Sequence, residues 1–520
     1  MDKLITHSPI LIIAIPLLVA FLTPLIGRIS EKARNVLVVV SLVFVEFLVI
    51  VLARDIYANG IHIYTLGASS PTLTIPEQYM VPVRIILQVD AMSIFMGIIA
   101  ATVSLAAAIY SLSFMKEETG QDSFYTLLLL LVAGMLGMVF TGDLFNLFVF
   151  LEIAAISGAG LAAFRIRFAD TAEGGFKYLV ISSAAALVVL FSVGIFYAQY
   201  NLLNIAALAQ VIQYTMLDKV ALALLVIAFA MKLGSVPLHM WVPDTYAAAP
   251  ASITAMLLVS SQICMYALFR TCFSLYGVTL NTATVGWIVI ILGMLSMFVG
   301  ATMAVLQTDV KRLIAYNCIC ESGYILLAVG VGLAVLGHPE ALTTYGIAAM
   351  SGGIFHMINH ALFEGLLFLA AGVLFYRAGT RNLNEMGGLA HNMKLTSILF
   401  LLGALASSGI PPFNGFASKL LIYESVYQFN PILAIIGIIV SIITLAVFVK
   451  AFFSAFTGQV LPKYKDVREA PKLMMLSMII LSIIIVFFGL FPGLIVDWLA
   501  HPAANALINQ AAYINAVVGG

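Results

Sequence analysis

Long apolar runs recur from one end of this 520-residue chain to the other. A helix of ~20 apolar residues crosses the ~30 Å hydrocarbon layer of a membrane. Only 9% of the residues are charged, whereas soluble domains carry about 25%. The runs are continuous, and the strands of a β-barrel would instead alternate over ~10 residues. The sequence therefore predicts an all-α polytopic membrane protein.

About 14 transmembrane helices can be placed on these runs. The predicted spans cover residues 8–27, 35–53, 86–111, 124–141, 144–164, 176–198, 219–242, 249–273, 284–305, 311–335, 344–376, 396–428, 431–456 and 473–498. No small-residue cleavage site follows the first apolar run, so we interpret it as a retained helix and not as a signal peptide.

Basic residues in the loops predict the orientation of the chain. When successive loops are assigned to alternate sides, Lys and Arg collect on the side that holds Arg28, Lys116 and Arg377. The side rich in Lys and Arg faces the cytoplasm, so we expect both termini to lie outside the cell or plasma membrane. The proline-containing loop 55–84 is then an extracytoplasmic loop.

Several classes of function are excluded by what the sequence lacks. It has no basic patch for nucleic-acid phosphates and no G-x-x-x-x-G-K-[ST] loop for a nucleotide. The four cysteines form no C-x-x-C pattern, and Cys318 and Cys320 point to different faces of a helix. We interpret the cysteines as packing residues, and we expect no cofactor, no metal site, no redox centre and no nucleic-acid partner.

Ionisable side chains at membrane depth are the main functional signal. A charged residue at the bilayer centre costs ~2.5–3.5 kcal/mol, so it persists where it faces water or protein. The candidates are Glu152, Lys232, His239, Glu321, His356, His360, Glu364, Lys419 and Lys450. A single member has a structural alternative, which is an interhelical ion pair or a side chain that snorkels to the interface, and this alternative is strongest for Lys450, Glu424 and Glu46. Together the candidates predict a proton or ion relay.

Two predicted spans are interrupted close to a lysine. Segments 232–244 and 407–419 each contain two prolines and at least one glycine, and each proline removes a helix donor. Irregular backbone at this depth is tolerated only beside protein or a water-filled cavity. One interrupted helix in each half is typical of transporters built from inverted repeats. A carboxylate that moves towards or away from Lys232 would switch this lysine between holding and releasing a proton.

Motifs along most of the chain, from about residue 90 to 450, resemble the antiporter-like proton-translocating subunit family. This family includes large membrane-arm subunits of NADH:quinone oxidoreductase, their counterparts in membrane-bound hydrogenases and the large subunits of Mrp-type cation/proton antiporters. The motifs that carry the resemblance are Asp90-Ala-Met-Ser93 and the segments 146–152, 232–250, 307–316, 356–360 and 409–419.

The resemblance implies a domain organisation. It implies 14 helices, with spans 4–8 and 9–13 as two inverted five-helix repeats and with helices 7 and 12 discontinuous. The chain then divides into an N-terminal three-helix region with the extracytoplasmic loop (1–123), a first repeat (124–273), a second repeat (284–456) and a C-terminal helix and tail (457–520).

The resemblance also implies roles for individual residues. Glu152 is similar to the glutamate that pairs with the lysine of the seventh span, here Lys232. Lys419 is similar to the terminal lysine of the twelfth span. His356 and His360 are similar to members of the hydrated polar axis that joins the two halves at mid-membrane.

The sequence departs from the family pattern at four places. Gln262 and Glu364 stand where the family usually has lysines, Tyr246 replaces a histidine, and Cys320-Glu321 replaces Ser-Gln or Ser-His. One interpretation is that Glu321 and Glu364 rebuild the relay with carboxylates. The other is that this chain couples differently, handling Na⁺ for example, or has kept only a structural role.

Three hypotheses of function follow. The first is an H⁺- and/or Na⁺-translocating subunit of a multisubunit respiratory complex, of the membrane-bound hydrogenase type or a related ferredoxin- or NADH-linked type. An alternative within this class is the large subunit of an Mrp-type Na⁺/H⁺ antiporter. The second hypothesis is a stand-alone secondary transporter, and the third a scaffold subunit that does not pump. In the first hypothesis the partners are other membrane subunits and the bilayer, and the chain itself is not catalytic.

We expect Asp90 and Asp309 to be helix caps.

Overall fold

The computed structural model describes residues 2–66, 85–165 and 168–518. Twelve helices in these ranges are long and apolar enough to cross a membrane. They are α1 (Asp2–Ile29), α2 (Glu31–Asn59), α3 (Ala91–Phe114), α4 (Gln121–Phe140), α5 (Leu144–Ala162), α6 (Ala169–Tyr200), α10 (Ala251–Phe269), α11 (Thr282–Leu306), α12 (Val310–Ala334), α14 (Ile347–Ala378), α17 (Pro431–Phe456) and α18 (Lys472–Leu490). These helices correspond to every predicted span except the seventh and the twelfth.

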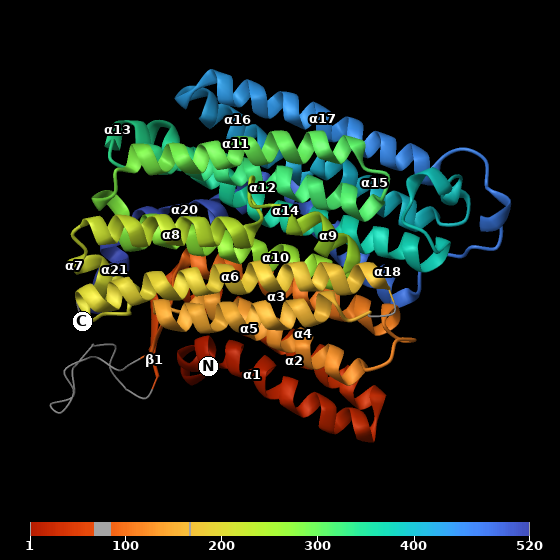
Figure 1. Cartoon of the computed structure of the whole chain (residues 1–520), viewed down its shortest axis with the longest axis horizontal. Coiled ribbons are helices and arrows are strands. Elements are labelled where there is room, and N and C mark those ends of the chain that lie inside the picture. The colour runs from red at the N-terminus through yellow and green to blue at the C-terminus, as the bar shows by residue number, and fades with distance from the viewer. Residues whose placement is uncertain (1, 67–84, 166–167, 519–520) are drawn as a thin grey trace.

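The helices lie side by side in one bundle (Figure 1). Helices α1 and α2 form one edge and α17 the opposite edge, while α10, α12 and α14 occupy the interior. The outer faces of α2, α6, α11 and α17 expose large apolar side chains, as lipid-facing helices do. Helix α1 begins towards the same end of the bundle at which α21 finishes (Figure 1). The prediction of an all-α polytopic membrane protein is confirmed.

The seventh and twelfth predicted spans are each built from two helices with a break between them. The seventh consists of α8 (Met216–Leu233) and α9 (Trp241–Ala248), and the twelfth of α15 (Lys394–Ser407) and α16 (Asn414–Phe429). Gly234 (φ 74°) and Gly409 (φ 72°) adopt the left-handed conformation at which each first helix ends. The predicted discontinuities are therefore present, close to the expected prolines.

Side chains satisfy backbone groups that the first break frees. The Ser296 hydroxyl accepts a hydrogen bond of 3.0 Å from the Val236 amide. The Trp241 indole donates one of 2.9 Å to the Met231 carbonyl. Unpaired backbone groups are costly in an apolar interior, so these contacts allow irregular backbone at this depth.

The N-terminal third differs from the prediction at one span boundary. Ile86–Val89 is a strand, β2, that pairs antiparallel with β1 (His62–Thr65). The Asp90 side chain then accepts a hydrogen bond from the Ser93 amide and caps α3, which begins at Ala91 and not at 86. Most of the predicted extracytoplasmic loop, residues 67–84, lies outside the described residues.

The C-terminal region contains more elements than one helix and a tail. Helix α18 ends at Leu490, and Pro492 begins the short helix α19 (Pro492–Ile495). Helices α20 (His501–Ile508) and α21 (Gln510–Val518) follow. The remaining helices are the short α7 (Ile205–Val211) and α13 (Pro339–Ala341), and a π-helical turn, Arg270–Tyr276, extends α10.

Helices α11 and α12 are in direct backbone contact. Gly286, Gly293 and Gly300 are spaced seven residues apart on α11 and face α12. A Cβ atom on Gly293 would lie 2.7 Å from the Leu327 backbone nitrogen and 2.8 Å from the Gly323 carbonyl oxygen. Small residues allow membrane helices to approach this closely. Helix α12, which carries part of the candidate site, is therefore held tightly against α11.

Candidate functional site

Lys419 lies in the first turns of α16, just after the second break, and its side chain is buried. Its ammonium donates to the Glu321 carboxylate at 2.9 Å and to the Ser407 carbonyl at 2.7 Å. The same nitrogen lies 4.6 Å from the centroid of the Tyr324 ring. The break frees the Ser407 carbonyl at the end of α15, and this carbonyl then holds the lysine.

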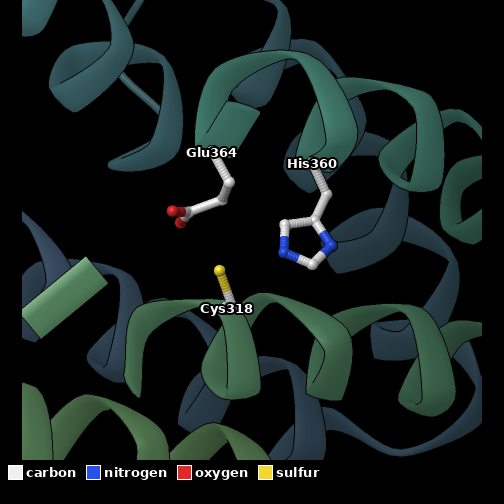
Figure 2. Close-up of side chains that lie close together, drawn as sticks. All are labelled: Cys318, His360 and Glu364. Carbon is white, nitrogen blue, oxygen red and sulfur yellow. The ribbon is translucent and has the colours of Figure 1, made fainter. Parts of the chain in front are cut away.

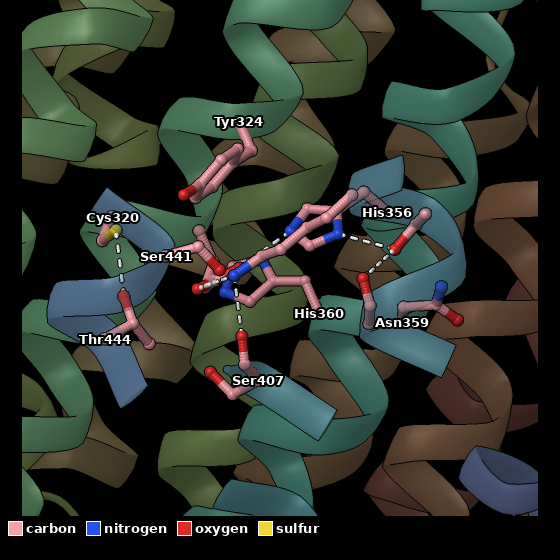
Figure 3. Close-up of polar contacts among 12 residues, drawn as sticks. Cys320, Tyr324, His356, Asn359, His360, Ser407, Ser441 and Thr444 are labelled. Carbon is pink, nitrogen blue, oxygen red and sulfur yellow. Dashed lines mark hydrogen bonds and ion pairs between the residues drawn. The ribbon is translucent and has the colours of Figure 1, made fainter. Parts of the chain in front are cut away.

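Glu321, on α12, contacts a second titratable group through its other oxygen. Its Oε2 lies 2.9 Å from His356 Nε2, and His356 Nδ1 lies 2.9 Å from the Ser418 hydroxyl. His356 and His360 are one turn apart on α14. Their rings are parallel, and the ring centroids are 6.5 Å apart. Lys419, Glu321 and the two histidines therefore form one buried polar row, part of which is visible in Figure 3.

The polar row continues to α10 through Gln262. The Gln262 amide lies 3.0 Å from His360 Nδ1 and donates to the Met357 carbonyl at 3.0 Å. One turn after His360, Glu364 accepts a hydrogen bond from Asn317, which also donates to the Ser407 hydroxyl at 2.8 Å. Gln262 therefore links the polar row to α10.

The first half is arranged differently around Lys232. This lysine is buried at the end of α8, with its ammonium 5.6 Å from the centroid of the Tyr178 ring. Glu152 on α5 is the carboxylate whose charge favours the protonated form of this lysine. Within the described residues no carboxylate lies within 4.0 Å of its ammonium. The two halves thus differ: Lys419 is ion-paired and Lys232 is not.

Two predicted site residues lie away from the buried row. His239 sits in the break between α8 and α9, and its Nδ1 has no hydrogen-bond partner in the described part of the chain. Lys450, on α17, donates to the carbonyls of Val305 and Gln307 at 2.7 and 2.9 Å. A cation at a helix C-terminus is stabilised by the helix dipole, so Lys450 caps α11.

Three further acidic residues have structural contacts. Asp309 accepts hydrogen bonds from the amides of Lys311 and Arg312 and caps α12. Asp90, besides capping α3, forms a buried ion pair with Arg270. Both aspartates are therefore helix caps, as expected. Glu46 accepts a hydrogen bond of 2.9 Å from Thr102.

Sequence reasoning missed four residues that contact the candidate residues, three through their side chains and Ser407 through its backbone carbonyl. Tyr324, Ser407, Ser418 and Asn317 lie beside Lys419, His356 and Glu364. A signal existed for two of them, because Tyr324 is one turn from Glu321 and Ser407 opens the broken segment. Cys318 was assigned to packing, yet its sulfur lies within 4.8 Å of possible ligand atoms of His360 and Glu364.

Comparisons with known proteins place this architecture among transporter and respiratory subunits. A family profile described as "NADH:quinone oxidoreductase/Mrp antiporter, TM" matches residues 141–444. Another, described as "NADH-Ubiquinone oxidoreductase (complex I), chain 5 N-terminus", matches residues 79–125.

Two curated relatives and one solved structure match most of the chain. NADH-quinone oxidoreductase subunit N of Desulforudis audaxviator is 32% identical over 509 residues, covering 93% of this chain and 96% of the relative. A Na⁺/H⁺ antiporter subunit of Alkalihalophilus pseudofirmus is 30% identical over 462 residues, covering 86% of this chain and 87% of the relative. A chain of the membrane-bound sulfane sulfur reductase, an archaeal respiratory membrane complex, has 27% identity and a TM-score of 0.84, covering 98% of this chain and 100% of that one.

Proposed function

This chain belongs to the NADH:quinone oxidoreductase/Mrp antiporter transmembrane family, and on that premise we propose that it moves protons across the plasma membrane as one subunit of a multisubunit respiratory complex. The resemblance drawn from the motifs is thereby confirmed. Its partners are other membrane subunits. The electron-transfer chemistry of such a complex belongs to those partners in this proposal.

The observation that carries the proposal is the buried contact of Lys419, Glu321 and His356. These groups touch one another at 2.9 Å in the interior of the bundle, so a proton can pass between them without a charge entering the lipid. His360 and Gln262 extend the row towards α10. Glu364 adds a carboxylate beside it, where the family usually has a lysine.

In the first half we propose that Glu152 controls the proton on Lys232. The ammonium has no carboxylate within 4.0 Å among the described residues, so an approach of Glu152 would stabilise its charge and a retreat would favour release. His239, in the adjacent break, is proposed to connect this lysine to the end of the bundle. A role of Lys450 in ion translocation stays a prediction, because its observed contacts are those of a helix cap.

The donor set favours H⁺ over Na⁺. Lys419 and the two histidines are nitrogen bases, whereas a hard cation takes oxygen ligands. Both Glu321 oxygens are already occupied by Lys419 and His356. An Mrp-type antiporter is the second candidate, and the match to the Na⁺/H⁺ antiporter relative supports it. The neighbouring subunits in the purified complex distinguish the two assemblies.

We further propose the topology and the division of the chain. Both termini face outward, the repeats comprise residues 124–273 and 284–456, and residues 1–123 and 457–520 flank them. The broken helices α8/α9 and α15/α16 occupy equivalent places in the two repeats, which supports this division. Cysteine-accessibility labelling at the two ends of the chain in intact cells tests the orientation.

Charge-removing variants test the relay. In vesicles that contain the whole complex, Lys232→Ala and Glu152→Ala should each abolish coupled proton pumping, measured with a pH-sensitive dye. Lys463→Ala, which removes an exposed loop lysine, is the control and should pump like the wild type. Pumping that survives both substitutions would reject the assigned roles.

Two outcomes would favour the other hypotheses. Robust solute uptake by the purified chain alone, in vesicles without other subunits, would favour a stand-alone transporter. Normal pumping by the complex after removal of Lys232, Lys419 and Glu321 would favour a scaffold subunit.

A further inference from the structure

Three potential metal ligands meet between α12 and α14. Cys318 on α12 faces His360 and Glu364, which are one turn apart on α14 (Figure 2). One ligand atom from each residue lies within 4.8 Å of the other two, and all three residues are buried. The proposed relay uses His360 and Glu364 but gives no role to the Cys318 thiol beside them.

The atoms that face the cluster have no partners. His360 Nε2 and Glu364 Oε2 are buried, and neither forms a hydrogen bond with the described residues. The other atom of each group is held: Gln262 contacts His360 Nδ1, and Asn317 donates to Glu364 Oε1. A metal ion on His360 Nε2 requires the ring proton on Nδ1, and Gln262 Oε1, which has no partner among the described residues, would accept that proton once the amide turns.

The donor set selects the kind of ion. A thiolate, an imidazole and a carboxylate are the ligands of tetrahedral zinc, whereas Mg²⁺ and Ca²⁺ require oxygen ligands. A Cys318 thiolate and a Glu364 carboxylate would together balance the two charges of Zn²⁺. The resulting complex is neutral, and a neutral complex avoids the cost of a buried net charge.

We propose that Cys318, His360 and Glu364 bind one Zn²⁺ ion, with a fourth position open, and that the bound ion stops proton transfer. Binding displaces the thiol proton and any proton on Glu364. The inhibitory part rests on the proposed function, because it requires His360 and Glu364 to act in the relay. The proposal that the three residues bind zinc does not depend on the proposed function.

The binding part is tested on the purified full-length chain in detergent. ZnCl₂ is titrated into the wild type, Cys318→Ala and Cys320→Ala, and bound zinc is measured after gel filtration. Cys320 is the matched control, since it lies on the same helix but its sulfur contacts Thr444 at 3.9 Å. We expect about one zinc per chain in the wild type and in Cys320→Ala, and an affinity at least about 100-fold lower in Cys318→Ala.

X-ray absorption at the zinc edge gives an independent readout. We expect one sulfur at about 2.3 Å and nitrogen or oxygen ligands at about 2.0–2.2 Å in the wild type. A first shell without sulfur, no bound zinc in the wild type, or equal affinity in Cys318→Ala would overturn the proposal. If Cys318→Ala does not fold, Cys318→Ser takes its place.

The inhibitory part is tested in vesicles that contain the whole complex. Zinc should inhibit pumping by the wild type and by Cys320→Ala, and should leave Cys318→Ala at least about tenfold less sensitive. Bound zinc with unchanged pumping would overturn inhibition and leave the metal site standing. The Lys232→Ala experiment, done without zinc, separately decides the proposed function.

Discussion

Replacing Glu321 by glutamine tests the energetics of the buried polar row. Gln keeps the size of the side chain but removes the charge that faces both Lys419 and His356. The ammonium of Lys419 then keeps only uncharged partners, which are the Ser407 carbonyl, the face of the Tyr324 ring and the amide oxygen of the new side chain. Lys419 and Glu321 are at most 1% exposed, so water cannot replace the lost carboxylate charge. Removal of one partner from such a pair costs about 3–5 kcal/mol.

A second substitution separates the charge effect from a packing effect. In Glu321→Gln/Lys419→Met the unpaired cation is also gone, and an apolar replacement of a buried pair is often close to neutral. We therefore expect the double variant to be more stable than Glu321→Gln alone by at least about 2 kcal/mol, or about 30-fold in the unfolding equilibrium. Glu340→Gln, at an exposed position, is the control and should change stability by less than about 0.5 kcal/mol.

Unfolding of the purified chain in detergent, followed by circular dichroism, measures these differences. The single variant Lys419→Met completes the set. The reasoning is refuted if the costs of Glu321→Gln and Lys419→Met add up to the cost of the double variant, because independent costs would mean that Lys419 and Glu321 do not stabilise each other. It is also refuted if Glu321→Gln alone is as stable as the wild type.

Three further predictions concern stability and are measured as shifts of the same unfolding transition. Lys450→Ala should lower the free energy of unfolding by about 0.3–1 kcal/mol, because the cap on α11 is lost. A decrease several times larger would contradict a capping role. Gly293→Val should cost about 1–3 kcal/mol through overpacking against α12, whereas Gly194→Val, which has open space at its Cβ, should be tolerated. Equal behaviour of the two valine variants would disprove the backbone contact. Asp90→Asn leaves the Arg270 charge buried without its counter-ion and should cost about 3–5 kcal/mol, and an unchanged transition would argue against a strong pair.

The helices could be predicted from the sequence because membrane spans depend on local composition. An apolar run of the right length forms a helix in lipid almost regardless of what surrounds it. The breaks near Lys232 and Lys419 were equally predictable, since a proline acts on its own backbone. The strand Ile86–Val89 was missed because a short apolar run reads the same in a strand and in a helix.

Contacts between helices could be predicted only in part. The buried acids, lysines and histidines were identifiable one by one, because each is costly in lipid. Their pairing depends on helix rotation, which sequence does not give. The ion pair of Lys419 with Glu321 and the separation of Lys232 from Glu152 therefore emerged only from the structure. Because helix rotation is not given by the sequence, the proximity of Cys318 to α14 could not be predicted either.

The backbone contact between α11 and α12 restricts which part of the second half can move. Glycines of α11 contact the backbone of α12 over several turns. Helix α12 therefore cannot slide or rotate unless it separates from α11 or moves together with it. The N-terminal end of α16 is packed as closely: a Cβ atom on Gly489 of α18 would lie 2.2 Å from the Pro412 carbonyl oxygen, and Asn414 exchanges hydrogen bonds with Asn359 on α14. Separation of Lys419 from Glu321 should therefore come from rotation of the lysine side chain, while the helices that carry the two residues stay in place.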